Sequence, residues 1–190
     1  MSHRYSSAFS HLILAGTGIY CLVQYHGDSF KFPCISYGVI ITNSLLGVWR
    51  WGNPDHGHKV EKPYNFTGFL QNIISLPFIV TQVWLAYNYQ KELAYLHSLV
   101  SVLPLTLYLA DRSKDDLVDL IIAANCVSLG VVSFLHENYY GISAAISYMI
   151  NHFWLREGNF DIEDVPVLDL FNYGLCFFCY FALRTLQGGK

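Results

Sequence analysis

The feature that most constrains this chain is a series of seven apolar stretches, each close to the length that a helix needs to cross a bilayer. A helix covers roughly 30 Å of hydrocarbon with about 20 residues. Within that hydrocarbon, every backbone N–H and C=O must be bonded inside its own segment, which favours helices. We therefore predict an all-α polytopic membrane protein, a bundle of about seven short transmembrane helices. The expected spans are about 8–25, 32–50, 66–88, 93–111, 117–135, 138–155 and 167–186.

The composition supports lipid as the solvent around this bundle. Only 13% of the 190 residues are charged, whereas an ordinary soluble domain carries about 25% charged residues. We expect one transmembrane helical domain over residues 1–190, and six helices is the alternative count because several stretches are near the minimum length. The net charge of −3, without a basic stripe, argues against nucleic acid as a partner.

Two boundaries between the apolar stretches predict tight turns. Residues 117–155 form a nearly continuous apolar region about twice as long as a bilayer accepts, so the chain must reverse at Glu137 and Asn138. The same reasoning applies to residues 66–111, which the polar sequence YNYQKEL at 87–93 divides. Each region is therefore predicted to be a helical hairpin.

The distribution of lysine and arginine predicts the orientation. With seven spans, the side that holds the N-terminus and the second, fourth and sixth connectors carries seven cations, and the opposite side carries four. Cytoplasmic loops are enriched in positive charge, so we expect the N-terminus in the cytosol. The short spans suit the thinner membranes of the endoplasmic reticulum or Golgi better than the plasma membrane.

The longest polar stretch, WRWGNPDHGHKVEKPYNF at 49–66, places His56 and His58 one residue apart. Histidine is a common metal ligand, but this pair has no third ligand nearby in the sequence. We expect no cofactor and no metal, with His56 and His58 as the one candidate pair. The sixth connector is predicted to hold the acidic residues Asp161, Glu163, Asp164 and Asp169, of which the first three are expected to form a solvated loop.

Asp119 and His152 are the candidate catalytic residues. Ser113 is predicted to cap the fifth helix, with Asp115 and Asp116 in its first turn, where negative charge is favourable. Asp119 lies one turn further in, and an ionisable residue inside a membrane suggests a function. His152, at the end of the sixth helix, is expected on the same membrane face and would supply acid–base chemistry.

Six more polar residues are predicted inside the membrane: His11, Asn43, Gln71, Asn72, His97 and Asn125. Such side chains usually bridge neighbouring helices through hydrogen bonds, and this is the interpretation that we favour. The alternative is a pathway, in which His11 and His97 would relay protons if the fold brought them together.

Three functions are compatible with these residues. The first is a binding, scaffold or assembly protein of the endomembrane system, whose partners are the lipid bilayer and other membrane proteins. The second is a membrane-embedded hydrolase of lipid-like substrates that uses Asp119 and His152, with help from His56 or His58. The third is a small proton-coupled carrier that uses His11, His97 and Asp119. The sequence leaves the choice, and the oligomeric state, open.

Overall fold

The computed structural model describes residues 2–25, 32–155 and 165–188, and this part of the chain is helical without any strand. The described residues form seven helical segments. α4 and α5 together make one interrupted segment, the short 3-10 turn η1 leads into α3, and the π-helical turn η2 extends α7. The prediction of an all-helical bundle is confirmed. The elements are α1 (Ser2–Gln24), α2 (Phe32–Gly52), η1 (Gly57–Val60), α3 (Glu61–Ala86), α4 (Lys91–Leu99), α5 (Val102–Leu109), α6 (Asp115–Leu135), α7 (Tyr139–Ile150), η2 (Asn151–Leu155) and α8 (Val167–Gly188).

Six of these segments are long and apolar enough to cross a membrane, by length and composition. The seventh, α7 with η2, is shorter, because α7 has 12 residues and η2 has 5. The six segments are Arg4–Gln24, Phe32–Gly52, Gly57–Ala86, Lys91–Leu109, Asp115–Leu135 and Val167–Gly188.

Both predicted reversals of the chain are present. Glu137, at the turn between α6 and α7, has a positive φ of 55°, and Asn138 caps α7 by accepting a hydrogen bond from the Gly141 backbone N–H. Between α3 and α4, Asn88 has a φ of 59°. This left-handed conformation reverses the backbone within a few residues, and asparagine tolerates it better than most residues.

The predicted cap of α6 is wrong. The residue before the first turn of this helix is Lys114 rather than Ser113, and its side chain makes no capping hydrogen bond. Asp115 and Asp116 do lie in the first turn, as expected. Negative charge near the positive end of the helix dipole can therefore stabilise this terminus without a side-chain cap.

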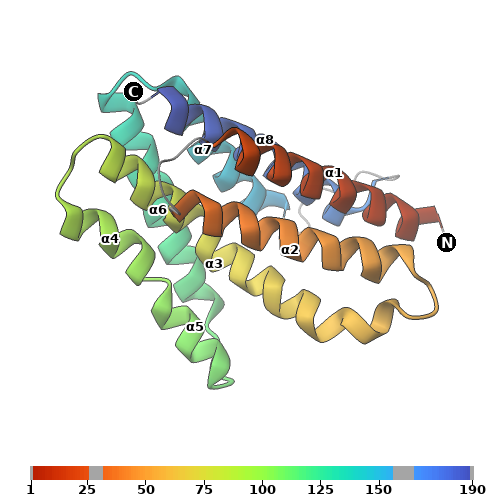
Figure 1. The fold of residues 1–190 in the computed structure, drawn as a ribbon. Coiled ribbons are helices and arrows are strands. Elements are labelled where there is room, and N and C mark those ends of the chain that lie inside the picture. Colours follow the sequence, from red (N-terminus) through yellow and green to blue (C-terminus); the bar gives the residue numbers. More distant parts are fainter. Residues whose placement is uncertain (1, 26–31, 156–164, 189–190) are drawn as a thin grey trace.

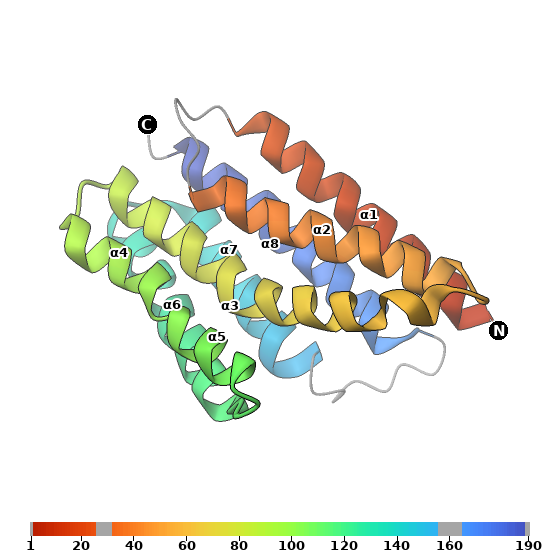
Figure 2. The ribbon, with the colours of Figure 1, turned by 60° about the horizontal axis from the view of Figure 1, so that its bottom comes forward.

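α1 packs against α2 and α8, α2 also packs against α3, and α7 packs against α6 and α8. Figures 1 and 2 show α4 and α5 on the far side of α3 from α1, beside α6. Large apolar side chains stay exposed on the outside, such as Val127 on α6 at 58% and Phe177 on α8 at 60%. An apolar outer surface of this kind is suited to contact with lipid.

The packing places four helix termini at one end of the bundle. α1 begins, α2 ends, and α3 and α8 begin at the same end, on the right in Figure 1. The residues of these four helices that lie two to three turns from this end include several amides and a histidine. They form the first of the two cavities described below.

Candidate functional site

A polar cavity lies between α1, α2, α3 and α8, and we call it the amide cavity. Its volume is about 470 Å³, within the range of about 300–1,000 Å³ that is common for small-molecule sites. Its lining combines five side-chain amides with an imidazole and a phenol, and it includes no Asp, Glu, Lys or Arg. The lining residues are His11, Asn43, Tyr64, Asn65, Gly68, Phe69, Gln71, Asn72, Leu155, Val167, Leu168, Phe171 and Asn172.

His11 reaches the amide cavity from the middle of α1. Its side chain is almost fully buried, at 1% exposure, and its Nε2 lies 3.1 Å from the Tyr64 hydroxyl on α3. The ring lies directly over Gly47 on α2, where a Cβ atom would come within 2.5 Å of it. The other ring nitrogen, Nδ1, has no hydrogen-bond partner among the described residues.

Asn43 and Gln71 join α2 to α3 beside His11. The Asn43 amide nitrogen donates to Gln71 Oε1 at 3.2 Å, and the Thr67 hydroxyl donates to Asn43 Oδ1 at 2.9 Å. Asn72, the next residue on α3, also lines the cavity, and its side chain makes no hydrogen bond within the described part of the chain. Asn43 and His11 therefore bridge helices and also face a cavity, and the cavity was not predicted.

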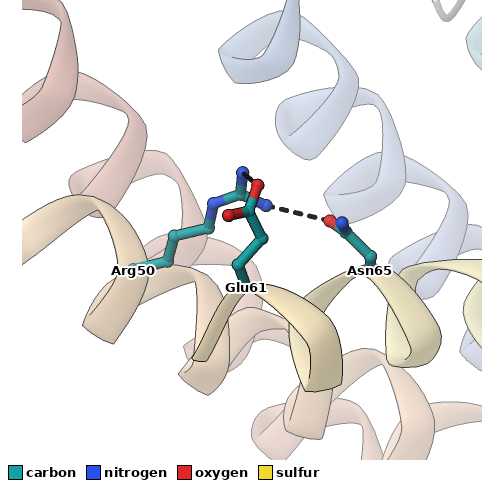
Figure 3. A network of polar contacts seen from close by, with 3 residues as sticks. All are labelled: Arg50, Glu61 and Asn65. Carbon is teal, nitrogen blue, oxygen red and sulfur yellow. Dashed lines mark hydrogen bonds and ion pairs between the residues drawn. The ribbon is translucent and has the colours of Figure 1, made fainter. Parts of the chain in front are cut away.

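Arg50 and Glu61 form an ion pair beside the Asn65 side of the cavity (Figure 3). The guanidinium group donates to Glu61 at 2.8 Å and to the Asn65 side-chain oxygen at 2.9 Å. It also lies 4.8 Å from the centre of the Tyr64 ring. The positive charge of Arg50 is thus already matched by a carboxylate and an aromatic face.

The placement of Asp169 in the sixth connector is wrong. Asp169 lies in the first turn of α8 and is fully buried. Its carboxylate accepts hydrogen bonds from the hydroxyls of Ser6 and Ser10, and the Asn172 amide donates to Ser10. The position near the start of a long helix favours a negative charge. This cluster fastens α1 to α8 next to the amide cavity. The other acidic residues of that connector, Asp161, Glu163 and Asp164, lie outside the described residues.

A spacing in the sequence could have indicated this cluster. Ser6 and Ser10 are four residues apart, so they share one face of a helix. A carboxylate that begins an apolar helix needs hydrogen-bond donors once that helix is buried. Ser6 and Ser10 lie near the start of the sequence and Asp169 lies near its end, so patterns among neighbouring residues could not predict that they pair.

The structure brings the two candidate catalytic residues together. His152 Nε2 lies 2.8 Å from Asp119 Oδ1, which joins η2 to α6. The His152 side chain is only 2% exposed and that of Asp119 is 34% exposed. The His152 ring is also nearly parallel to the Tyr148 ring, with 6.4 Å between the ring centres. Neither Asp119 nor His152 lines the amide cavity or the second cavity described below.

The remaining predicted site residues lie elsewhere. His56 and His58 are both exposed, in the connector between α2 and α3. Among the described residues, no group of three or more His, Cys, Asp or Glu could hold a metal ion. His97 on α4 contacts Asn125 and Ser128 on α6, at 3.1 and 3.2 Å. Because His11 and His97 have separate partners, the described hydrogen bonds do not connect them as a relay.

A second, apolar cavity of about 620 Å³ lies between α7 and α8, and we call it the apolar groove. Asn151, which is 2% exposed, is a polar exception in its wall, and its Oδ1 has no hydrogen-bond partner among the described residues. Leu155, the last residue of η2, lines both this groove and the amide cavity, so the two are neighbours. The groove is lined by Ser143, Ile146, Ser147, Ile150, Asn151, Leu155, Leu170, Tyr173, Gly174, Phe177 and Phe181.

Comparisons with known proteins give a family but no activity. No curated protein and no solved structure matches the chain. One family model does match the chain. The match runs from just before α2 to near the end of α8, and it includes every residue that lines the amide cavity except His11. The family model described as a domain of unknown function (DUF4791) matches residues 29–183, most of the chain, so this protein belongs to the DUF4791 family.

Proposed function

We propose that this protein is a multi-pass integral membrane protein of the endomembrane system that acts by binding, and that the amide cavity is its binding site. Six helices with the length and composition of membrane spans support the location in a membrane. The short apolar stretches favour a thin bilayer, such as that of the endoplasmic reticulum or Golgi. The excess of lysine and arginine on the side of the N-terminus supports a cytosolic N-terminus.

The observation that carries the proposal is the concentration of uncharged polar side chains around a cavity in the spanning part of the helices. Asn43, Gln71, Asn72 and Asn172 lie on three different helices and meet His11 there. Polar groups in this environment are costly to bury unless they have partners. Several of these side chains bind one another, but part of their capacity remains unused, and a bound molecule would use it.

The hydrolase is the second candidate, because Asp119 and His152 lie within hydrogen-bond distance of each other. A carboxylate that orients a histidine is a recurring arrangement in acid–base catalysis. Catalysis would also need a space for substrate beside the histidine, and neither residue lines the amide cavity or the apolar groove. The binding function is placed first because its buried polar residues themselves line a cavity.

A comparison of three purified proteins tests the choice: the natural sequence, Asn72→Leu and Asp119→Asn. Each is extracted from cell membranes in a mild detergent and analysed by native mass spectrometry for small molecules that remain bound. We expect the natural sequence and Asp119→Asn to carry the same adduct and Asn72→Leu to lose it. Asn72 suits this test because its side chain lines the cavity without holding another described residue.

Two results would contradict the proposal. If the natural sequence carries no adduct even after incubation with a lipid extract of its source membranes, the amide cavity is not a binding site. If Asp119→Asn loses the adduct and Asn72→Leu keeps it, the molecule binds at the Asp119–His152 pair, which favours the hydrolase. Folding of each variant is checked by circular dichroism and gel filtration.

A further inference from the structure

The two cavities have complementary chemical properties, and Leu155 belongs to both. One is rich in amides and the other is lined mainly by aliphatic and aromatic side chains. A molecule that filled both would need a polar end and an apolar end. This is the general constitution of a membrane lipid, and lipid is the medium that the spanning helices imply.

The amide cavity favours a polar end without a net charge. No Asp, Glu, Lys or Arg lines it, and an ionised group would remain buried without a counter-charge, which is costly. Arg50, the cation beside the Asn65 side, is already paired with Glu61 (Figure 3). Asp169, the neighbouring carboxylate, accepts hydrogen bonds from Ser6 and Ser10 and does not line the cavity.

The unused hydrogen-bonding groups of the cavity indicate what this uncharged end must offer. His11 Nδ1 is buried and has no partner among the described residues, while Nε2 of the same ring lies next to Tyr64. The Asn72 amide can both donate and accept. Gln71 accepts a hydrogen bond through its oxygen, and its NH₂ group remains to donate. A hydroxyl group, which donates and accepts, matches such a mixed set.

The apolar groove favours an acyl chain as the other end. Ile146, Ile150 and Leu170 line it together with Phe177 and Phe181. Phe177 is 60% exposed and Ile146 is 53% exposed, so the groove lies on the outer surface of the bundle, where a chain can enter from the bilayer. A chain that comes from hydrocarbon gains no transfer energy from water, so the groove would hold it through close packing against these side chains.

We infer that the ligand of this protein is a membrane lipid with an uncharged, hydroxyl-bearing head, which binds in the amide cavity while an acyl chain lies in the apolar groove. The inference rests on the proposed function and names the class of molecule that the site takes. It assigns the head to His11, Gln71 and Asn72, and the chain to the groove between α7 and α8.

Three related probes test the inference in phosphatidylcholine nanodiscs that contain the full-length protein. The first is 1-monooleoylglycerol, with two hydroxyls and one chain. The second is 1-oleoyl-lysophosphatidic acid, in which a phosphate replaces one of those hydroxyls. The third is glycerol, the head without the chain. The readout is the midpoint of thermal unfolding, because a ligand that binds only the folded state raises it.

We expect monooleoylglycerol to raise the midpoint by about 5 °C at saturation, a shift that corresponds to a concentration near 100-fold above Kd for a protein of this size. We expect neither the lysophosphatidate nor glycerol to do so. The shift should disappear in Asn72→Leu, which alters the head site, and in Ile146→Trp, which fills the groove. Val127→Trp is the matched control, since Val127 is a similarly exposed residue on α6 that does not line the groove.

Each other result overturns a stated part of the inference. A shift with glycerol that survives Ile146→Trp would indicate a site for free polyols. A larger shift with the lysophosphatidate would indicate an anionic head. A full shift in Asn72→Leu would place the head outside the amide cavity. If no probe shifts the midpoint while the natural sequence still carries an adduct that Asn72→Leu loses, the class of lipid is wrong and the binding function stands.

Discussion

At the scale of single residues, Gly47 decides how closely α1 and α2 approach beside the amide cavity. The imidazole ring of His11 lies so near to Gly47 that a Cβ atom there would come within 2.5 Å of the ring. Real side chains do not tolerate that distance, and the ring is fixed by Tyr64 on its other side. Glycine at position 47 therefore leaves the room that His11 needs to be buried between α1 and α2.

We predict that Gly47→Ala lowers the free energy of unfolding by about 1–3 kcal/mol, because the added methyl group overpacks the contact with His11. Gly38→Ala, on the same helix, is the matched control, since nothing lies within 4 Å of the position of its Cβ. It should leave the stability unchanged or raise it by up to about 1 kcal/mol through helix propensity. Unfolding of the purified proteins in one detergent measures both. Equal stability of the two variants would contradict the contact.

At the scale of helices, the corner between α6 and α7 holds two distant helices in place. Asn138 caps α7, and its amide nitrogen also donates to the Tyr87 hydroxyl at 2.8 Å and to the Thr185 carbonyl oxygen at 3.0 Å. One side chain thus connects the turn to the end of α3 and to the last turns of α8. The turn was predicted from the sequence, whereas these two connections depend on the packing.

We predict that Asn138→Ala lowers the free energy of unfolding by about 2 kcal/mol, since it removes the cap and both donated hydrogen bonds. Asn138→Asp should be no better, because a carboxylate retains the cap but cannot donate to Tyr87 or Thr185. Tyr87→Phe, which removes one of the three bonds, should cost about 1 kcal/mol. Denaturant titration in detergent gives the three values. If Asn138→Asp proves as stable as the natural sequence, only the cap matters.

At the scale of the whole molecule, the number of crossings decides where the two termini lie. α1 begins and α8 ends at opposite ends of the bundle (Figure 1). An odd number of crossings would have this consequence. Six segments are long and apolar enough to cross a membrane, so the shorter segment formed by α7 and η2 would have to supply the seventh. Six crossings would return both termini to one side.

We predict that a glycosylation acceptor fused to the C-terminus is modified in microsomes and that one fused to the N-terminus is not. The reason is that the expected seven crossings would place the termini on opposite sides, and the excess of cations favours a cytosolic N-terminus. A shift in gel mobility that is reversed by a glycosidase measures the modification. Modification of both fusions, or of neither, would support six crossings instead.

Much of the fold could be predicted because it depends mainly on apolar stretches, which are local features of the sequence. A run of apolar residues implies a helix wherever lipid is the solvent, and turns such as Glu137–Asn138 follow from the length that a bilayer accepts. The exact start of α6 was harder to predict. Ser113 and Lys114 are neighbours, and hydropathy does not distinguish which of them precedes the first turn.

The sequence by itself determined the class of fold, the approximate spans and the set of polar residues that needed partners. Only the tertiary structure decided which of them meet. It placed Asp119 against His152, buried Asp169 beneath Ser6 and Ser10, and gathered the amides of α2, α3 and α8 around His11. The physical reason is that hydropathy acts along the chain, whereas a hydrogen bond between helices requires a register and a rotation that only the packing of the whole bundle sets.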